Sequence, residues 1–121
     1  MNLEANIKAN AKRGYDLLLD YLNVRYIDIE LDNFDESNPS YSILAHLFPE
    51  DICGESVEEL MKFRDPTLRF DRIKFAAAVR FKIDHGFILW MGSSKDEYEI
   101  LTNAWKKLII EGKERYERRT L

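Results

Sequence analysis

The strongest helical pattern in this chain lies between residues 98 and 109, and it constrains the fold more than any other feature. Its apolar side chains recur at intervals of three and four residues, which places them on one face of an α-helix. Ser94 and Glu97 precede it with the spacing of a capping box. The sequence therefore predicts a long helix here, and this helix is expected to be the central packing surface. The stripe consists of Tyr98, Leu101, Ala104, Trp105, Leu108 and Ile109.

Four further stretches show helical spacing. The first predicts a helix of about 20 residues beginning near Leu3, with Gly14 in its middle. An interior glycine costs roughly 1 kcal/mol relative to alanine. It is either tolerated here or marks a kink or a close helix crossing. The other three helices run from Asn38 as N-cap to Pro49, from a second capping box at Ser56 and Glu59 to the residues before Asp65, and from Asp71 as cap to His85 and Gly86.

Two segments have the pattern of extended chain. In residues 27–31, Ile and Leu alternate with Asp and Glu, as in a half-buried strand whose carboxylates face water. Residues 87–91 are apolar, lie between two glycines and are too short for a helix. We predict that these segments pair as a two-stranded ribbon covered by helices, because an isolated hairpin is only marginally stable. A strand over residues 79–83, in place of the fourth helix, is an alternative.

Length and composition favour a single globular domain over residues 1–121. A chain of this size buries about two-thirds of the surface that its unfolded form exposes. Seven Phe, six Tyr, two Trp and a hydrophobic fraction of 45% distinguish it from disordered chains. The expected fold is mainly α, a compact helical domain with a small two-stranded β ribbon, and an α+β fold is the alternative. The single cysteine, Cys53, cannot form an internal disulfide, so a reducing, cytoplasmic compartment is expected.

Neither a membrane nor duplex DNA is an expected partner. The first ten residues contain Glu4 and no apolar run, unlike a signal peptide, and no apolar stretch approaches the roughly 20 residues that span a bilayer. The formal net charge of −4 disfavours duplex DNA, because DNA binding depends on basic side chains that displace counterions from the phosphates.

The charged residues form two opposite blocks. The acidic block, Tyr26 to Met61, contains ten carboxylates and no Lys or Arg. The basic block, Lys62 to Lys82, contains seven cations and two carboxylates, so its net charge is 7 − 2 = +5. Like charges repel within a Debye length of about 8 Å unless something opposes them. Either the two blocks pack together and neutralise each other, or the acidic block forms a surface for a basic partner.

Three short stretches have a combined pattern: SILAHL at Ser42 to Leu47, HGF at His85 to Phe87, and YEILTNAWKKLI at Tyr98 to Ile109. Together they resemble a group of small, uncharacterised bacteriophage proteins. In that group the first stretch has Cys, Gly and Gln where this chain has Ser42, Ala45 and His46, so a role that depends on the Cys does not carry over. The resemblance implies a phage or mobile-element origin and implies no activity.

The acidic block and this resemblance together suggest a function. We predict a non-enzymatic protein-binding module that inhibits or redirects a host protein, such as a defence factor, through an acidic face. The partner is expected to present a basic surface, either on a protein or on a protein–nucleic acid complex, because opposite charges steer association. The sequence leaves the oligomeric state open. The candidate contact residues are Asp28, Glu30, Asp32, Asp35, Glu36, Glu55, Glu58 and Glu59.

The basic block suggests a second hypothesis, a small binder of single-stranded nucleic acid or nucleotides. Bases stack on aromatic side chains while cations follow the phosphates, and this block contains both kinds of residue. We favour the simpler explanation, in which the phenylalanines belong to the core and the cations are solvated or paired. The candidate contact residues for this alternative are Arg64, Arg69, Arg72 and Lys74.

No catalytic residue, cofactor or metal site is predicted. Residues 28–35 place carboxylates at alternate positions, as a calcium loop does, but Asn33 and Pro39 stand where such a loop needs Gly and Glu. Cys53 and His46 are the remaining candidates for a nucleophile and a base, and a structural role for the cysteine is favoured. His85 is expected in the last turn of its helix, where a cation interacts favourably with the helix dipole.

Overall fold

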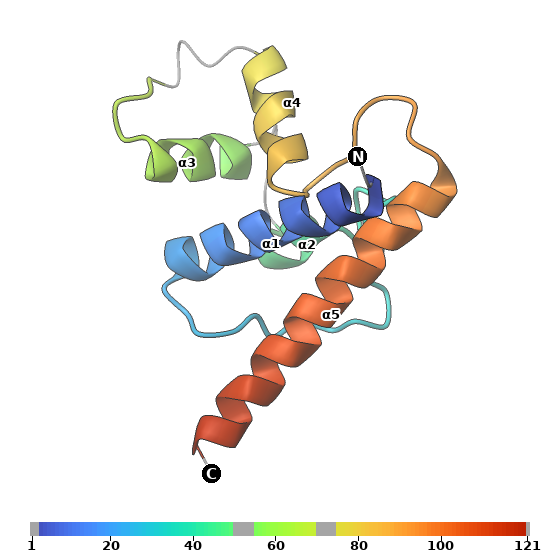
Figure 1. The fold of residues 1–121 in the computed structure, drawn as a ribbon. Coiled ribbons are helices and arrows are strands. Elements are labelled where there is room, and N and C mark those ends of the chain that lie inside the picture. Colours follow the sequence, from blue (N-terminus) through green and yellow to red (C-terminus); the bar gives the residue numbers. More distant parts are fainter. Residues whose placement is uncertain (1–2, 50–54, 70–74, 121) are drawn as a thin grey trace.

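The computed structural model describes residues 3–49, 55–69 and 75–120, which form helices joined by loops (Figure 1). The described residues contain no strand, so the prediction of a two-stranded ribbon is wrong and the α+β alternative fails with it. The strand alternative for residues 79–83 is wrong too, because they lie within a helix. The helices are α1 (Leu3–Leu22), α2 (Ile43–Leu47), α3 (Glu55–Arg64), α4 (Phe75–Asp84) and α5 (Lys95–Thr120).

The two segments predicted to pair as strands each pack against helices instead. In residues 27–31 the expected alternation is present, since Ile27 is buried while Asp28 and Glu30 are exposed. In residues 87–91, the Phe87 ring stacks on Trp105 of α5 with 5.9 Å between ring centroids. An alternation with a period of two indicates that one face of a segment is buried. It does not show whether the backbone of the segment also pairs with another strand.

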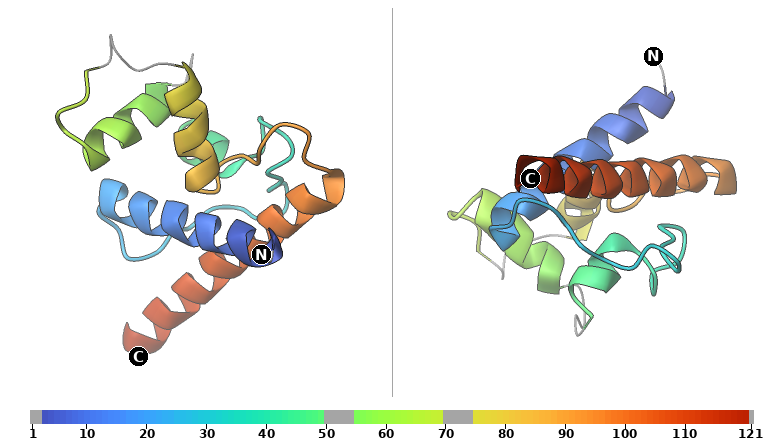
Figure 2. Two further views of the ribbon diagram at one scale, coloured as in Figure 1. Left: turned by 45° about the horizontal axis from the view of Figure 1, so that its top comes forward. Right: turned by 90° about the horizontal axis from the view of Figure 1, so that it is seen from below.

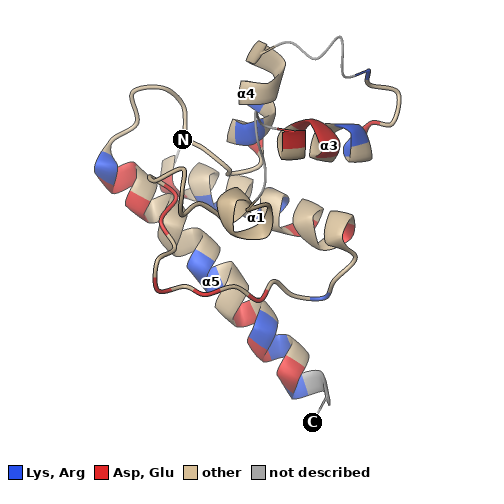
Figure 3. Ribbon diagram, turned by 180° about the vertical axis from the view of Figure 1, so that it is seen from behind, with Lys and Arg blue, Asp and Glu red and all other residues tan. Residues whose placement is uncertain are grey.

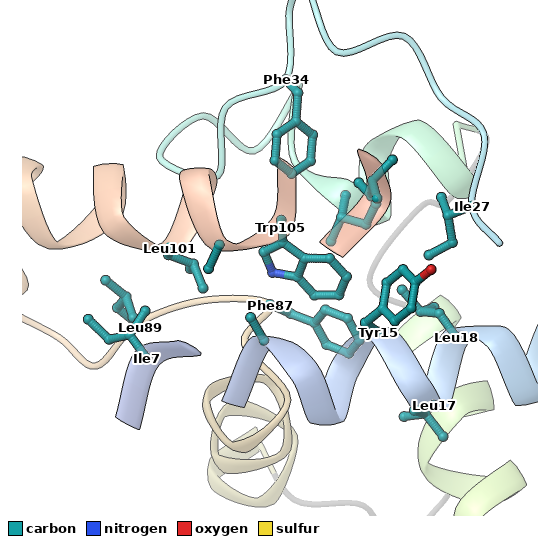
Figure 4. Close-up of a cluster of buried hydrophobic side chains, with 14 of the residues drawn as sticks. Ile7, Tyr15, Leu17, Leu18, Ile27, Phe34, Phe87, Leu89, Leu101 and Trp105 are labelled. Carbon is teal, nitrogen blue, oxygen red and sulfur yellow. The ribbon is translucent and has the colours of Figure 1, made fainter. Parts of the chain in front are cut away.

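The core lies where α1 and α5 cross, and these two helices make the most extensive contact between helices in the structure (Figure 2). The predicted stripe is the buried face of α5, with Leu101 and Trp105 fully buried, so the prediction of a central packing helix is confirmed. Figure 4 shows the Trp105 indole beside Phe87 and close to the side chains of α1. The α1 residues that complete this core include Ile7, Ala11, Tyr15 and Leu18.

The helix limits confirm some of the predicted caps. The predicted first helix is confirmed, because α1 spans 20 residues from Leu3. The capping box before α5 is also confirmed: the Ser94 N–H donates to Glu97 Oε1 at 3.2 Å, and the Glu97 N–H donates to Ser94 Oγ at 3.1 Å. Both predictions rested on apolar stripes that continue over several helical turns. The stripe of α5 also has a capping box directly before it.

Other predicted caps are wrong or lie outside the described residues. Helix α2 begins at Ile43 with Ser42 as N-cap, so Asn38 does not cap it; Asn38 Oδ1 instead accepts the Ser40 N–H within a turn. Helix α3 already includes Glu55, so Ser56 is not its N-cap. The predicted cap at Asp71 lies outside the described residues. Asn38, Ser40 and Ser42 all precede α2 and all are capping residue types, so the sequence alone does not identify which of them caps it.

A turn between α4 and α5 packs closely against α1. The N–H groups of Gly86 and Phe87 donate to the carbonyls of Ile83 and Lys82, the pattern of a Schellman motif, and Gly86 has a φ of +67°. A Cβ on Gly14 would overlap the carbonyl oxygen of His85, and one on Gly86 would lie 2.6 Å from backbone atoms of Ala11. Gly14 is therefore required by a close backbone approach and is not merely tolerated.

Helices α3 and α4 pack less closely than α1 and α5. They contact each other and α1, and they lie on the opposite side of α1 from the segment that follows it (Figure 1). Helix α4 has no buried residue, whereas α1 has six. Within the described ranges, no helix combines the length and the apolar character that a transmembrane span requires.

Candidate functional site

The predicted contact residues of the acidic block fall on two separate parts of the molecule. Four of them lie on the segment between α1 and α2, and we call this group the carboxylate edge: Asp28, Glu30, Asp32 and Asp35. Glu55, Glu58 and Glu59 lie on α3, with α1 between the two groups (Figures 1 and 3). The structure therefore does not bring the eight predicted residues together on one surface.

Buried apolar residues hold the carboxylate edge in place. Ile27 and Phe34 are 2% and 3% exposed and belong to the core shared by α1 and α5. Ile29 and Leu31, which lie between these two residues in the sequence, pack against the same core. The four carboxylates alternate with these residues or follow them, and all four are exposed. This fixes the backbone of the segment, so the carboxylates are presented on an ordered surface.

The carboxylate edge keeps most of its negative charge. Asp28 Oδ1 lies 3.3 Å from Lys113 Nζ of α5, but the pair is exposed, and such pairs are weak. Asp35 Oδ1 accepts hydrogen bonds from the backbone N–H and the hydroxyl of Ser37 at 2.9 and 2.7 Å, and these hold the pKa of Asp35 below its ordinary value. Within the part of the chain that the structure describes, Glu30 and Asp32 form no ion pair.

Glu36 differs from its neighbours because it is only 4% exposed. Its Oε1 accepts the N–H of Ile43 at the start of α2 at 2.8 Å, and its own N–H donates to Thr102 Oγ1 of α5 at 2.9 Å. Among the described residues, its Oε2 has no hydrogen-bond partner. Burial raises the pKa of Glu36 to about 8. The side chain is thus neutral at neutral pH and joins the segment to α2 and α5, so it is not part of the exposed edge.

A hollow of about 660 Å³ lies beside the carboxylate edge, between the segment and the first half of α5. Asp32 and Asp35 line it from the segment, and Lys95, Glu99 and Lys106 line it from α5. Both lysines lower the pKa of Asp35 through their positive charge, after the larger effect of the Ser37 hydrogen bonds. The hollow therefore carries charges of both signs, and of the carboxylate edge only Asp28 and Glu30 do not line it.

The basic block is described only in part. Arg64 and Arg69 lie within the described residues, whereas Arg72 and Lys74 do not. The aromatic residues of this block divide between the core and the surface, since Phe81 packs against His85 and Phe87 while Phe75 is 83% exposed. Among the described phenylalanines of this block, Phe81 packs against the core, whereas Phe63 and Phe75 are exposed.

The two histidines are engaged by the fold. His46 Nδ1 lies 2.9 Å from the Ser42 carbonyl oxygen, and Cys53, its proposed partner, lies outside the described residues. His85 is buried just past the end of α4, and its Nδ1 lies 2.8 Å from the Phe81 carbonyl oxygen. Burial lowers the pKa of His85, so the expectation of a cationic histidine at this helix end is wrong.

Sequence reasoning missed Arg13, which the fold places near Arg64 and Arg80. Arg13 of α1 and Arg80 of α4 line the same hollow as Arg64 and His85, with a volume of about 580 Å³. Arg80 belongs to the basic block, but Arg13 lies at the other end of the chain, and nothing in the local sequence pairs it with the block. For the described residues, no group of three or more His, Cys, Asp or Glu side chains is placed to hold a metal ion.

Comparisons with protein-family models, with curated proteins and with solved structures gave no match to this chain. No family, fold or function is therefore transferred from a relative.

Proposed function

We propose that this protein is a non-enzymatic protein-binding module that recognises a basic partner surface through the carboxylate edge. The observation that carries the proposal is the anchored alternation along residues 27–35. Ile27 and Phe34 are buried on one side, and Asp28, Glu30, Asp32 and Asp35 are exposed on the other. A surface that is already ordered loses little conformational entropy when it binds.

Electrostatics supports a basic partner. The carboxylates of Glu30 and Asp32 have no ion pair within the described residues, and hydrogen bonds from Ser37 stabilise the charged form of Asp35. A partner with lysine or arginine side chains would supply the missing counterions. Such complementarity raises the association rate more than it lowers the dissociation rate, and the effect weakens with salt.

The class of partner follows from the resemblance of residues 42–47, 85–87 and 98–109 to small phage proteins. On that hypothesis the partner is a cytoplasmic protein of a bacterial host, and binding inhibits or redirects it.

The test begins with capture of partners from a bacterial lysate at low salt and continues with association rates for each purified partner. The informative variant is Glu30→Lys with Asp32→Lys, which reverses two exposed charges on the edge. The matched control is Glu111→Lys with Glu114→Lys, which makes the same change on an exposed part of α5. We expect the edge variant to slow association by about tenfold at low salt and the control to leave it near the wild-type rate.

Two results would contradict this proposal. One is a partner whose association rate does not depend on salt, and the other is an equal effect of both variants. Binding of single-stranded oligonucleotides that weakens with salt and is lost on changing Arg69, Arg72 and Lys74 to Glu would instead favour the second hypothesis.

A further inference from the structure

Three arginines from three different helices line one hollow, which we call the arginine hollow. Arg13 comes from α1, Arg64 from the end of α3 and Arg80 from α4. The hollow has a volume of about 580 Å³, large enough for a small organic molecule. Arg64 and Arg80 both belong to the basic block, and the fold brings Arg13 of α1 next to them.

Arg13 and Arg64 are held by hydrogen bonds to neutral groups, whereas Arg80 is exposed and pairs with Asp84. Arg13 Nε–H donates to the Asp84 backbone carbonyl at 3.0 Å, and Arg13 also donates to the side-chain oxygen of Asn10. Arg64 Nη1 lies 3.2 Å from His85 Nε2. Arg80 Nε lies 3.8 Å from a carboxylate oxygen of Asp84, in an exposed pair. Asp84 is the one carboxylate that lines the hollow, so its lining carries 3 − 1 = +2.

His85 fixes the position of Arg64 from the inner side of the hollow. A carbonyl oxygen only accepts hydrogen bonds, so the contact with Phe81 places the ring proton on Nδ1. Nε2 of the neutral ring is then the acceptor for Arg64. An arginine has five N–H donors, and this bond uses one of them. The remaining donors of Arg64 are available to a ligand while the side chain stays oriented.

We propose that the arginine hollow binds a phosphate monoester whose substituent is apolar or aromatic. A phosphate monoester carries close to two negative charges at neutral pH, which matches the +2 of the lining. Guanidinium groups form bidentate hydrogen bonds to phosphate oxygens. Met61, Ala77 and Phe81 form the apolar part of the same lining. Inorganic phosphate would satisfy the arginines and leave this apolar wall uncovered. An ester with an aromatic group would cover both.

Phenyl phosphate tests this proposal directly, with inorganic phosphate as the comparison. Each is titrated into ¹⁵N-labelled protein while the Nε–Hε signals of the arginines are followed by NMR. We expect phenyl phosphate to shift the signals of Arg13, Arg64 and Arg80 and to bind more tightly than inorganic phosphate. Signals of arginines outside the hollow, such as Arg118, should move little.

Two variants establish whether the arginines carry the binding. Arg64→Gln removes the guanidinium that His85 orients, and we expect it to weaken phenyl phosphate binding by about tenfold, the usual effect of losing one charge-assisted hydrogen bond. Arg80→Gln replaces a side chain that is 84% exposed, so the variant should keep the wild-type fold. It should bind phenyl phosphate more weakly than the wild type does. Arg118→Gln, an exposed arginine of α5, is the matched control and should bind as the wild type does.

Several outcomes would overturn the proposal. Absence of shifts at millimolar phenyl phosphate would do so, as would shifts that persist unchanged in both hollow variants. Equal affinities for phenyl phosphate and inorganic phosphate would remove the role of the apolar wall. Oligonucleotide binding that is lost in both hollow variants, in a protein whose arginine signals phenyl phosphate does not shift, would assign these arginines to a nucleic-acid surface instead. A failure of phenyl phosphate to bind leaves the proposal for the carboxylate edge intact, because the edge lies on a different part of the molecule.

Discussion

Helices α1 and α4 contact the same turn around Gly86, yet one is deeply buried and the other is not. Helix α1 contributes six buried residues, and its backbone touches the turn at Ala11 and Gly14. Helix α4 contributes none, although it contains three consecutive alanines and forms ten helical residues. The three alanines favour the helical conformation of α4, but a helix of ten residues is marginal on propensity alone, so its half-buried face, which includes Phe81 against the core, stabilises it as well. The two helices therefore differ in how deeply they are packed.

The two proposed sites lie in regions that differ in how closely their helices pack. The carboxylate edge belongs to the packed region, which comprises α1, α5, α2 and the segment between α1 and α2. Ile27 and Phe34 anchor the backbone of the edge. The arginine hollow lies where α3 and α4 meet α1, and α4 has no buried residue. Local unfolding favours regions with few buried apolar contacts. We therefore expect α4 to open with a smaller free energy than α1 or α5.

The largest expected effect concerns Glu36 in the packed region. Its pKa is raised by burial from an ordinary value near 4.5 to about 8, with a smaller contribution from the charge of Asp35. The folded protein thus keeps this proton up to about pH 8, while the unfolded chain loses it near pH 4.5. The free energy of unfolding should fall as pH rises through this window, by roughly 3 to 5 kcal/mol for a pKa difference of this size.

Urea unfolding of the wild type and of Glu36→Gln at about pH 5 and about pH 9 measures this loss. The amide stays neutral and keeps an oxygen to accept the Ile43 N–H, so the variant should lose much less stability between the two pH values. Glu99→Gln changes an exposed carboxylate of α5 and is the control. Parallel pH profiles for the wild type and Glu36→Gln would show that Glu36 is ionised in the folded protein.

The next effect concerns the contact between α1 and the turn. Gly14→Ala should destabilise the protein by about 3 kcal/mol or more, because the new methyl group would overlap the His85 carbonyl and the backbones would have to separate. Thermal and urea unfolding measure the loss. Gly92→Ala adds the same methyl group at a φ of +88° with nothing within 4 Å, so it should cost only about 1 kcal/mol. Equal losses would mean that the α1 contact is not tight.

The long helices could be predicted from the sequence because one pattern determines them. Both α1 and α5 have apolar stripes sustained over several turns, and such stripes are buried whatever the partner is. The ribbon could not be judged in the same way. The alternation in residues 27–31 indicated a buried face correctly, but a local pattern does not identify what covers that face. Here α1 and α5 cover it.

Glu36 shows why the site was predictable only in part. A turn at Asp32 and Asn33, closed by a hydrogen bond from the Phe34 N–H to the Leu31 carbonyl, shifts the register of the segment. As a result Phe34 and Glu36 face inward while Asp35 faces outward. By composition, Asp32, Asp35 and Glu36 are equivalent acidic residues. The turn leaves the two aspartates exposed and buries Glu36. Arg13 was missed for a related reason, since its neighbours in the hollow are far away in the sequence.

A smaller effect is expected at the exposed start of α5, even though the middle of this helix is the centre of the packed region. Ser94→Ala removes the side-chain acceptor of the Glu97 N–H and should cost about 1 kcal/mol of unfolding free energy. Ser40→Ala, at an exposed serine that caps no helix, is the control and should change stability by less than about 0.5 kcal/mol. A change of similar size in both variants would mean that the capping box adds little to stability.

The smallest effect is expected on α4 and tests the comparison from its other side. Phe75 is 83% exposed at the start of α4, whereas Phe87 is 2% exposed against Trp105. Phe75→Ala should change the free energy of unfolding by less than about 0.5 kcal/mol. Phe87→Ala, the same substitution in the core, should cost about 3 to 5 kcal/mol. A loss above about 1 kcal/mol for Phe75→Ala would mean that the first turn of α4 is buried in solution. The contrast in burial between α1 and α4 would then be smaller than the structure shows.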